Sequence, residues 1–137
     1  MIAFFDTNVH IDLLTGKFSL DAVLRKIGSL PVRLSPVVAS ELLRGVSVQG
    51  RSAIDKLIGQ LVAVEPPSWR QCWYDAGRLL PRIFSDYEEV GLSRLQNDLL
   101  LALTARHTGA LFVTGDDHFD AIRRYVPFQL RKLQINR

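Results

Sequence analysis

The sequence predicts an α/β protein with a mostly parallel central β-sheet. Short apolar runs typical of buried strands alternate along the chain with longer segments of helical periodicity. The length of 137 residues suits about one domain, and the 47% of hydrophobic residues can form a real core. Because no repeat, low-complexity segment or linker interrupts the alternation, we expect a single domain over residues 1–137.

In the first half of the chain, helix signals stand between three apolar runs. Ser19 and Ser35 have N-cap character, whereas Gly16 and Gly45 end helices and Pro31 breaks one. The elements expected here are strand Ile2–Phe5, helices Asn8–Leu14 and Leu20–Ile27, strand Val32–Leu34, helices Pro36–Arg44 and Ser52–Leu61, and strand Leu61–Val64.

In the second half, Ser68 opens a helix after a pair of prolines, and Ser93 or Asn97 is expected to cap a later one that Gly109 ends. The segment Ser85–Gly91 is predicted to be a loop or a broken helix. The expected elements are a helix carrying Trp69, Trp73 and Leu80, a helix ending near Thr108, strand Leu111–Thr114, helix Asp117–Arg124 and strand Phe128–Leu133.

Composition argues against several classes of protein, including disulfide-rich, zinc-binding and membrane-spanning ones. The single cysteine, Cys72, excludes an internal disulfide and a cysteine-rich zinc site, and it favours a reducing cytoplasm. The N-terminus has no basic start, and no apolar stretch reaches the roughly 18 residues of a membrane span. The net charge of +3 mildly favours an acidic partner such as nucleic acid.

Four short acidic motifs carry most of the chemical information. They are DTN at Asp6–Asn8, SELLRG at Ser40–Gly45, ND at Asn97–Asp98 and TGDDHF at Thr114–Phe119. Each places a carboxylate near the end of a predicted strand or on a predicted helix. In parallel α/β sheets the ligand cleft lies beyond the carboxyl ends of the strands, so these motifs can converge there. The candidate carboxylates are Asp6, Glu41, Asp98 and Asp116.

Several carboxylates in one cleft repel one another unless a cation lies among them. Oxygen ligands suit Mg²⁺ or Mn²⁺, so the set indicates metal-dependent phosphodiester chemistry. Each carboxylate also has a local alternative role. Asp6 could cap a helix, Glu41 could pair with Arg44, Asp98 could stabilise the first turn of a helix, and the aspartates of TGDDHF could form a turn and a cap.

Other reactive or aromatic residues favour structural roles. His10, His107 and His118 lack the spacing of a HExxH site, so we expect surface or packing positions for them. Trp69 and Trp73 are four residues apart, and a core or oligomer contact is favoured over base stacking. Serine hydrolase, NTPase and dinucleotide-binding motifs do not occur in the sequence.

The four motifs resemble those of the PIN-domain ribonucleases, particularly the VapC-type toxins of toxin–antitoxin pairs. The similar stretches are MIAFFDTNVHIDLL, LSPVVASELLRGV, NDLLLALTAR and LFVTGDDHF, and they span nearly the whole chain. The resemblance implies a three-layer α/β/α sandwich. It also implies that Asp6, Glu41 and Asp98 are the three acidic ligands and that Asp116 is the fourth, a role that its neighbour Asp117 could take over.

The resemblance further implies that Thr7, Asn8, Asn97 and Thr114 orient the ligands. It implies Mg²⁺ or Mn²⁺ as cofactor, an RNA substrate, a homodimer and a cognate antitoxin that blocks the cleft. In this interpretation Asp6, Asp98 and Asp116 hold one ion, while Glu41 acts at a second ion or orients the attacking water. Arg44 is the candidate phosphate contact, with an ion pair to Glu41 as its alternative.

Two other functions are considered. A haloacid-dehalogenase-like phosphatase also places an aspartate after its first strand, but that chemistry needs a second acid where Asn8 stands. A non-catalytic PIN-like module that binds RNA or protein is the other alternative, and the intact acidic set argues against it.

Overall fold

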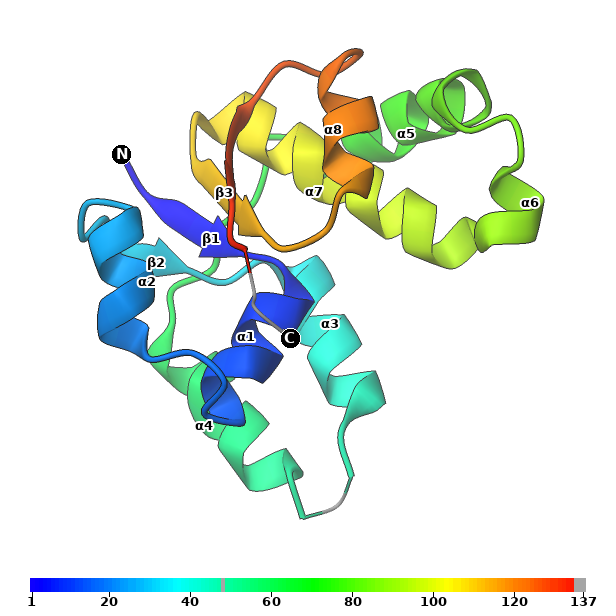
Figure 1. Cartoon of the computed structure of the whole chain (residues 1–137). Helices are drawn as coiled ribbons and strands as arrows, with labels where there is room; N and C mark the ends of the chain where they lie inside the picture. Colours follow the sequence, from blue (N-terminus) through cyan, green and yellow to red (C-terminus); the bar gives the residue numbers. More distant parts are fainter. Residues whose placement is uncertain (48, 135–137) are drawn as a thin grey trace.

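A parallel β-sheet lies at the centre of the protein (Figure 1). The computed structural model describes residues 1–47 and 49–134, so residues 48 and 135–137 of the expected domain lie outside the described residues. Within the described part, four strands form one sheet in the order β2-β1-β3-β4, and every neighbouring pair is parallel. The strands are β1 (Ala3–Phe5), β2 (Val32–Arg33), β3 (Leu111–Thr114) and β4 (Gln129–Lys132). The predicted fold class is therefore confirmed.

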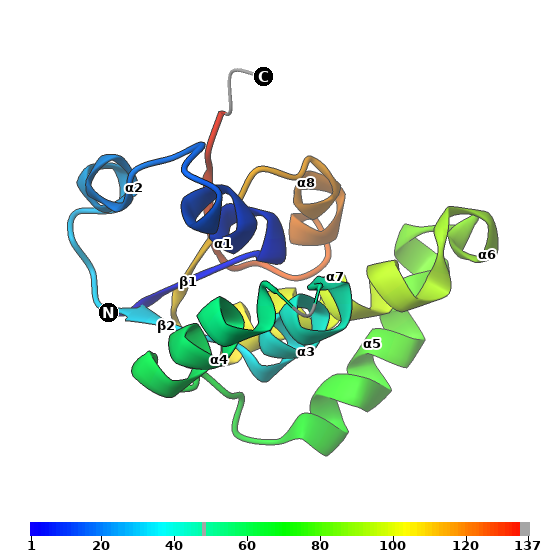
Figure 2. The ribbon, with the colours of Figure 1, turned by 90° about the horizontal axis from the view of Figure 1, so that it is seen from below.

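Successive side chains of the inner strands point to opposite faces of the sheet, and each face has its own core. Phe4 and Phe112 belong to the larger core, whereas Phe5 and Val113 belong to the smaller one. Helices α1 (Thr7–Leu14) and α2 (Leu20–Lys26) cover the smaller core, and Figure 2 shows them across the sheet from α3, α4 and α7. The three-layer α/β/α arrangement follows from these two cores.

The larger core is built around one buried helix. This helix is α7 (Leu92–Thr108). It shares the core with the other helices of that face, which are α3 (Pro36–Gly45), α4 (Arg51–Gln60), α5 (Trp69–Ile83) and α8 (His118–Arg123). In α7 every residue from 98 to 105 is buried, as expected for a helix surrounded by protein. The ring of Phe112 lies 4.9 Å from that of Phe4 and 4.7 Å from that of Phe119, which ties β1, β3 and α8 together.

Local helix signals are confirmed. The hydroxyl oxygen of Ser19 accepts a hydrogen bond from Ala22 N at 3.1 Å. Ser35 and Ser68 accept equivalent bonds at 3.2 Å and cap α3 and α5. Gly109 ends α7 with a φ of 72°, in the left-handed region that glycine adopts without strain.

The predicted strand Leu61–Val64 is wrong. Within the described residues this segment makes only an isolated parallel bridge between Ala63 and Leu34. Leu34 N donates to Val62 O, and Val64 N donates to Leu34 O, both at 3.0 Å. The predicted strand is therefore reduced to one bridge, made with Leu34 just after the end of β2.

The expected cap of α7 is also wrong. The helix begins at Leu92 after Gly91, and neither Ser93 nor Asn97 caps it. A short helix, α6 (Tyr87–Val90), lies in the segment expected to be a loop or broken helix. Asp98 consequently lies well inside α7 rather than in its first turn, so stabilisation of a helix terminus does not explain this carboxylate.

Candidate metal centre

The acidic motifs meet at the carboxyl ends of the two inner strands. Asp6 directly follows β1, and Asp116 lies two residues after β3. Glu41 reaches the same edge from α3, and Asp98 reaches it from the buried face of α7. The charges of Asp6, Asp116 and Glu41 all raise the pKa of Asp98, so the four carboxylates share one electrostatic site.

The first wall of this centre consists of Asp6, Thr7 and Glu41. Asp6 Oδ1 accepts a hydrogen bond from Thr7 N at 2.8 Å, and its Oδ2 accepts one from the Thr114 hydroxyl at 2.7 Å. The Thr7 hydroxyl donates to Glu41 Oε1 at 3.0 Å. Burial raises the pKa of Asp6, and these hydrogen bonds offset part of that rise. The chain itself therefore fixes the carboxylates of the first wall.

The second wall consists of Asp98, Asp116 and His118. Its members each offer one ligand atom, and these atoms lie within 4.8 Å of one another. The Asp98 side chain is only 9% exposed. Among the described residues, neither Asp98 Oδ2 nor His118 Nδ1 has a hydrogen-bond partner. Burial, together with the charges of Asp6 and Asp116, raises the pKa of Asp98 to about 8. A divalent cation would satisfy both atoms, so the residues present fit a bound metal ion.

The aspartates of TGDDHF have different surroundings. Asp116 accepts hydrogen bonds from Arg94 at 2.8 Å and from His118 N at 2.9 Å. Burial alone would raise the pKa of Asp116, but these two bonds lower it below its usual value. The side chain of Asp117 is 88% exposed and accepts a hydrogen bond from Lys132 at 2.8 Å. Asp116 therefore faces the centre, whereas Asp117 lies outside it.

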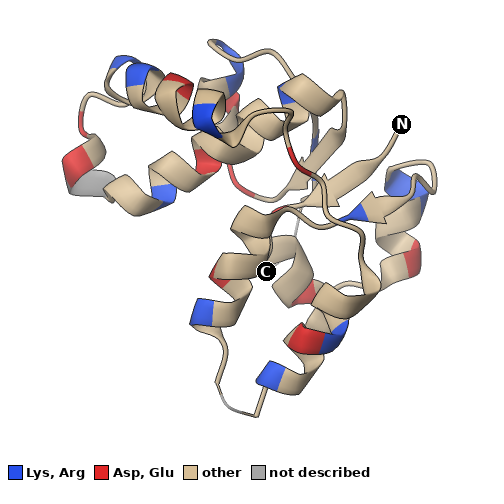
Figure 3. Ribbon diagram, turned by 180° about the vertical axis from the view of Figure 1, so that it is seen from behind, with Lys and Arg blue, Asp and Glu red and all other residues tan. Residues whose placement is uncertain are grey.

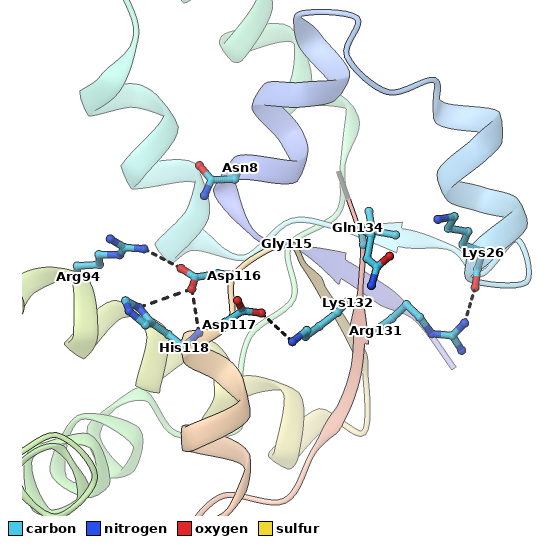
Figure 4. A pocket seen from close by; sticks show the side chains of 11 residues that line it. Asn8, Lys26, Arg94, Gly115, Asp116, Asp117, His118, Arg131, Lys132 and Gln134 are labelled. Atoms are coloured by element: carbon cyan, nitrogen blue, oxygen red, sulfur yellow. Dashed lines mark hydrogen bonds and ion pairs between the residues drawn. The ribbon is translucent and has the colours of Figure 1, made fainter. Parts of the chain in front are cut away.

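A cavity of about 1100 Å³ lies against the second wall (Figure 4). Asp116, His118 and Arg94 line one side of it, and Asn8 lines it from α1. Basic residues of α2 and β4 form the far side, namely Lys26, Arg131 and Lys132. The cavity therefore places the carboxylate of Asp116 on the same lining as several cationic side chains, which could contact an anionic molecule.

Asn97 and Arg44 are not in this cavity. They line a separate groove of about 310 Å³ together with Trp69 and Trp73. Within the described residues Arg44 makes no ion pair with Glu41, which accepts from Thr7 instead. Trp73 is 46% exposed, so the core position is wrong for this residue, and the oligomer contact expected as its alternative stays a prediction.

The histidines divide into two kinds. His10 is buried against Phe5 with 5.3 Å between ring centroids, and burial lowers its pKa to about 4. His107 is exposed. These two are the packing and surface residues that were expected. His118 also packs against an aromatic ring, that of Phe84, but its Nδ1 lies 3.6 Å from Asp116 Oδ1, a position beside the carboxylates that was not expected from the sequence. Its place directly after two aspartates was the available signal.

Charge on the rest of the surface is mixed. Figure 3 shows Lys and Arg interspersed with Asp and Glu over the helices in that view. The basic residues with a clear relation to the centre are therefore those that line the cavity beside it. No helix in the described part of the chain combines the length and apolarity needed to cross a membrane.

This parallel sheet, with clustered carboxylates at the ends of its inner strands, is the architecture of a PIN domain. The family model for the PIN domain matches residues 3–125, and the chain belongs to that family. This membership gives the phosphatase alternative no support.

Two solved structures share this fold over almost their whole length. One is VapBC2 from Rickettsia felis bound to a DNA fragment from its promoter, with 22% identity and a TM-score of 0.65 over 98% of this chain and 100% of that chain. The other is VapBC-1 from nontypeable Haemophilus influenzae, with 20% identity and a TM-score of 0.64 over 96% and 98%. A comparison with curated protein sequences finds no match.

Proposed function

We propose that the protein is a metal-dependent endoribonuclease and the toxin of a VapC-type toxin–antitoxin pair. The observation that carries this proposal is the buried, unpartnered Asp98 Oδ2 beside the carboxylates of Asp6, Glu41 and Asp116. Carboxylates are retained in such a place when a cation neutralises them. The family and the acidic cluster together favour phosphodiester hydrolysis over another use of the ion.

In this proposal some residues bind the ion and another orients the attacking water. Asp98 and Asp116 hold the ion, and Asp6 adds a lone pair of an oxygen that already accepts one hydrogen bond. A bound Mg²⁺ or Mn²⁺ supplies a Lewis acid that lowers the pKa of a coordinated water. Glu41, held by Thr7, orients the attacking water from the opposite wall. With this set no histidine is needed as a general base.

The shape of the cavity favours single-stranded or looped RNA. Asn8 and Arg94 line the cavity beside the ligands, and Lys26 and Arg131 line it farther away. A flexible strand can follow this path and bring one phosphate to the ion, whereas the backbone of a duplex is less able to enter a cleft.

The toxin assignment adds a protein partner. It is supported by the VapC-like motifs and by the shared fold with VapBC2 and VapBC-1. A cognate antitoxin would block the cleft in the cytoplasm, and the toxin would act as a homodimer. The pair between Arg94 and Asp116 demonstrates that a guanidinium fits beside these carboxylates, which is the kind of group an antitoxin could insert.

The direct test is cleavage of total cellular RNA by the purified protein with Mg²⁺, with Mn²⁺ or with EDTA, followed by mapping of the new ends. We expect cleavage only with an ion, and its loss in Asp6→Asn and Asp98→Asn. Asp55→Asn is the control, because this exposed aspartate lies on α4, away from the centre and its cavity. Undiminished cleavage by Asp98→Asn, or cleavage in EDTA, would contradict the proposal.

A non-catalytic binding module is the second candidate. The groove lined by Trp69, Trp73 and Arg44 favours it, because the exposed ring of Trp73 can stack on a base without any ion. Calorimetric titration with Mn²⁺ separates the two functions. A nuclease binds the ion, whereas a scaffold that uses the groove retains RNA binding in EDTA and binds no Mn²⁺.

A further inference from the structure

We propose that His118 is a nitrogen ligand of the metal centre and that it makes the site prefer a transition-metal ion such as Mn²⁺ over Mg²⁺. The inference rests on the metal site of the proposed function, but it does not depend on RNA cleavage. It changes the site from an all-carboxylate cluster to one of mixed nitrogen and oxygen donors.

The spacing of the second wall supports a shared ion. His118 Nδ1 lies 3.6 Å from Asp116 Oδ1 and 3.8 Å from Asp98 Oδ2, and Figure 4 shows its ring turned toward Asp116. These separations are longer than ordinary hydrogen bonds. Two ligands that each lie about 2.1 Å from one ion are themselves about 3–3.5 Å apart. Small side-chain shifts would therefore bring all three atoms to one cation.

The two buried atoms without hydrogen-bond partners also support a shared ion. Asp98 Oδ2 and His118 Nδ1 are both buried, and in the described part of the chain neither has a hydrogen-bond partner. A buried polar atom left without a partner costs about 1–3 kcal/mol. One ion between the two atoms would give both of them a partner at once. Two separate waters would be needed to do the same.

The backbone sets the position of the imidazole. His118 is the first residue of α8, and its amide donates to Asp116 Oδ1 at 2.9 Å. The imidazole also makes a T-shaped contact with the ring of Phe84, with centroids 6.3 Å apart and planes at 64°. The ligand and its neighbouring carboxylate are thus fixed by one turn, so the imidazole is placed before an ion arrives.

The donor type determines the preferred ion. Mg²⁺ favours oxygen ligands, whereas imidazole nitrogen favours first-row transition-metal ions. Removing His118 should therefore weaken Mn²⁺ binding more than Mg²⁺ binding. The competing role is an ion pair with Asp98 and Asp116, and it makes the opposite prediction. In that case the imidazolium competes with the ion, and its removal would tighten binding of both ions.

The test uses Mn²⁺ alone as the probe of the full chain. Pulsed electron paramagnetic resonance of the wild type should show ¹⁴N modulation from an imidazole on Mn²⁺, and His118→Ala should lose it. His107→Ala, which alters an exposed histidine, should keep it. By calorimetry we expect His118→Ala to weaken Mn²⁺ binding by at least the roughly 10-fold that loss of a group behind a ligand causes. Mg²⁺ binding should weaken by a smaller factor.

His118→Asn is a control for misfolding. Its amide oxygen can still bind the ion, so a folded variant should retain Mn²⁺ while it loses the ¹⁴N imidazole signal. Bound Mn²⁺ without nitrogen modulation in the wild type overturns the inference. Tighter Mn²⁺ binding by His118→Ala also overturns it. Nitrogen modulation in a protein that cleaves no RNA supports the inference while contradicting the proposed function. Cleavage without nitrogen modulation does the reverse.

Discussion

The two walls of the metal centre differ in how their polar atoms are satisfied. In the first wall, the Thr7 amide and the Thr114 hydroxyl donate to Asp6, and the Thr7 hydroxyl donates to Glu41. In the second wall, Asp98 Oδ2 and His118 Nδ1 have no hydrogen-bond partner within the described residues. Asp116 of the second wall does accept hydrogen bonds from Arg94 and His118 N. The difference teaches that the chain satisfies the carboxylates at the strand ends by itself, and that it leaves the facing atoms of Asp98 and His118 without a partner of its own.

Thr114 joins the two walls. Its hydroxyl donates to Asp6 Oδ2 and accepts from Asp116 N at 3.0 Å. A single buried side chain at the end of β3 therefore sets the distance between the strand-end carboxylates. The contrast between the walls gives separate expectations for substitutions in the first wall, in the second wall and at this link.

The largest effect is expected for ion binding at Asp98. For the wild type, Mn²⁺ at 100 times its Kd should raise the free energy of unfolding by about 2.7 kcal/mol, which is about 10 °C in Tm. Asp98→Asn should abolish this rise, because the amide cannot replace the carboxylate as an anionic ligand. Thermal melting with and without Mn²⁺ measures it, and Asp55→Asn, an exposed substitution on α4, should behave as wild type. An equal Tm rise in Asp98→Asn would contradict the idea that the second wall differs from the first because it binds an ion.

Thr114→Val should have the next largest effect. Valine keeps the shape, but it removes the donor to Asp6 and the acceptor for the Asp116 amide. Loss of this link should lower RNA cleavage by about 10–100-fold, and leaving buried groups unpaired should cost about 1–3 kcal/mol of stability. Denaturant unfolding and cleavage rates measure the two effects. Wild-type activity in Thr114→Val would mean that the walls are positioned independently.

Thr7→Val tests the first wall alone. The substitution removes the hydroxyl that donates to Glu41, while the backbone amide that donates to Asp6 remains. We expect cleavage to fall by about tenfold, at the low end of the range for groups that orient a ligand. Stability should fall by about 1 kcal/mol. Calorimetry should show nearly unchanged Mn²⁺ affinity, and a large loss of affinity would place Glu41 among the ligands of the first ion.

Arg94→Gln should have the smallest effect. Unlike the other substitutions, which lower ion binding, cleavage or stability, it should raise the affinity for Mn²⁺. The Arg94 side chain is 56% exposed and neutralises Asp116 in the absence of an ion. Exposed ion pairs contribute about 0.2–1 kcal/mol, so removing this one should tighten Mn²⁺ binding by at most about fivefold. Calorimetry gives the answer. Weaker binding in Arg94→Gln would show that Arg94 supports the second wall rather than competing with an ion.

The site was partly predictable from local sequence. Asp6 and Asp116 could be placed at strand ends because Ile2–Phe5 and Leu111–Thr114 are apolar runs that stop at polar residues. The environment of Asp98 was not predictable, because α7 begins at Leu92 without a side-chain cap to mark its start. The strand predicted at Leu61–Val64 failed for a related reason, since periodicity does not show whether a neighbouring strand offers enough edge to pair with.

Sequence by itself determined the helix caps, the apolar strands and the carboxyl groups available for a metal centre, because those features depend on residues a few positions apart. Only the tertiary structure distinguished Asp116 from Asp117, which are chemically identical neighbours with different partners, Arg94 and Lys132. It also brought His118 to Asp98 and Thr114 to Asp6, the latter pair 108 residues apart. Contacts at that separation exist only after the parallel sheet has aligned the strand ends.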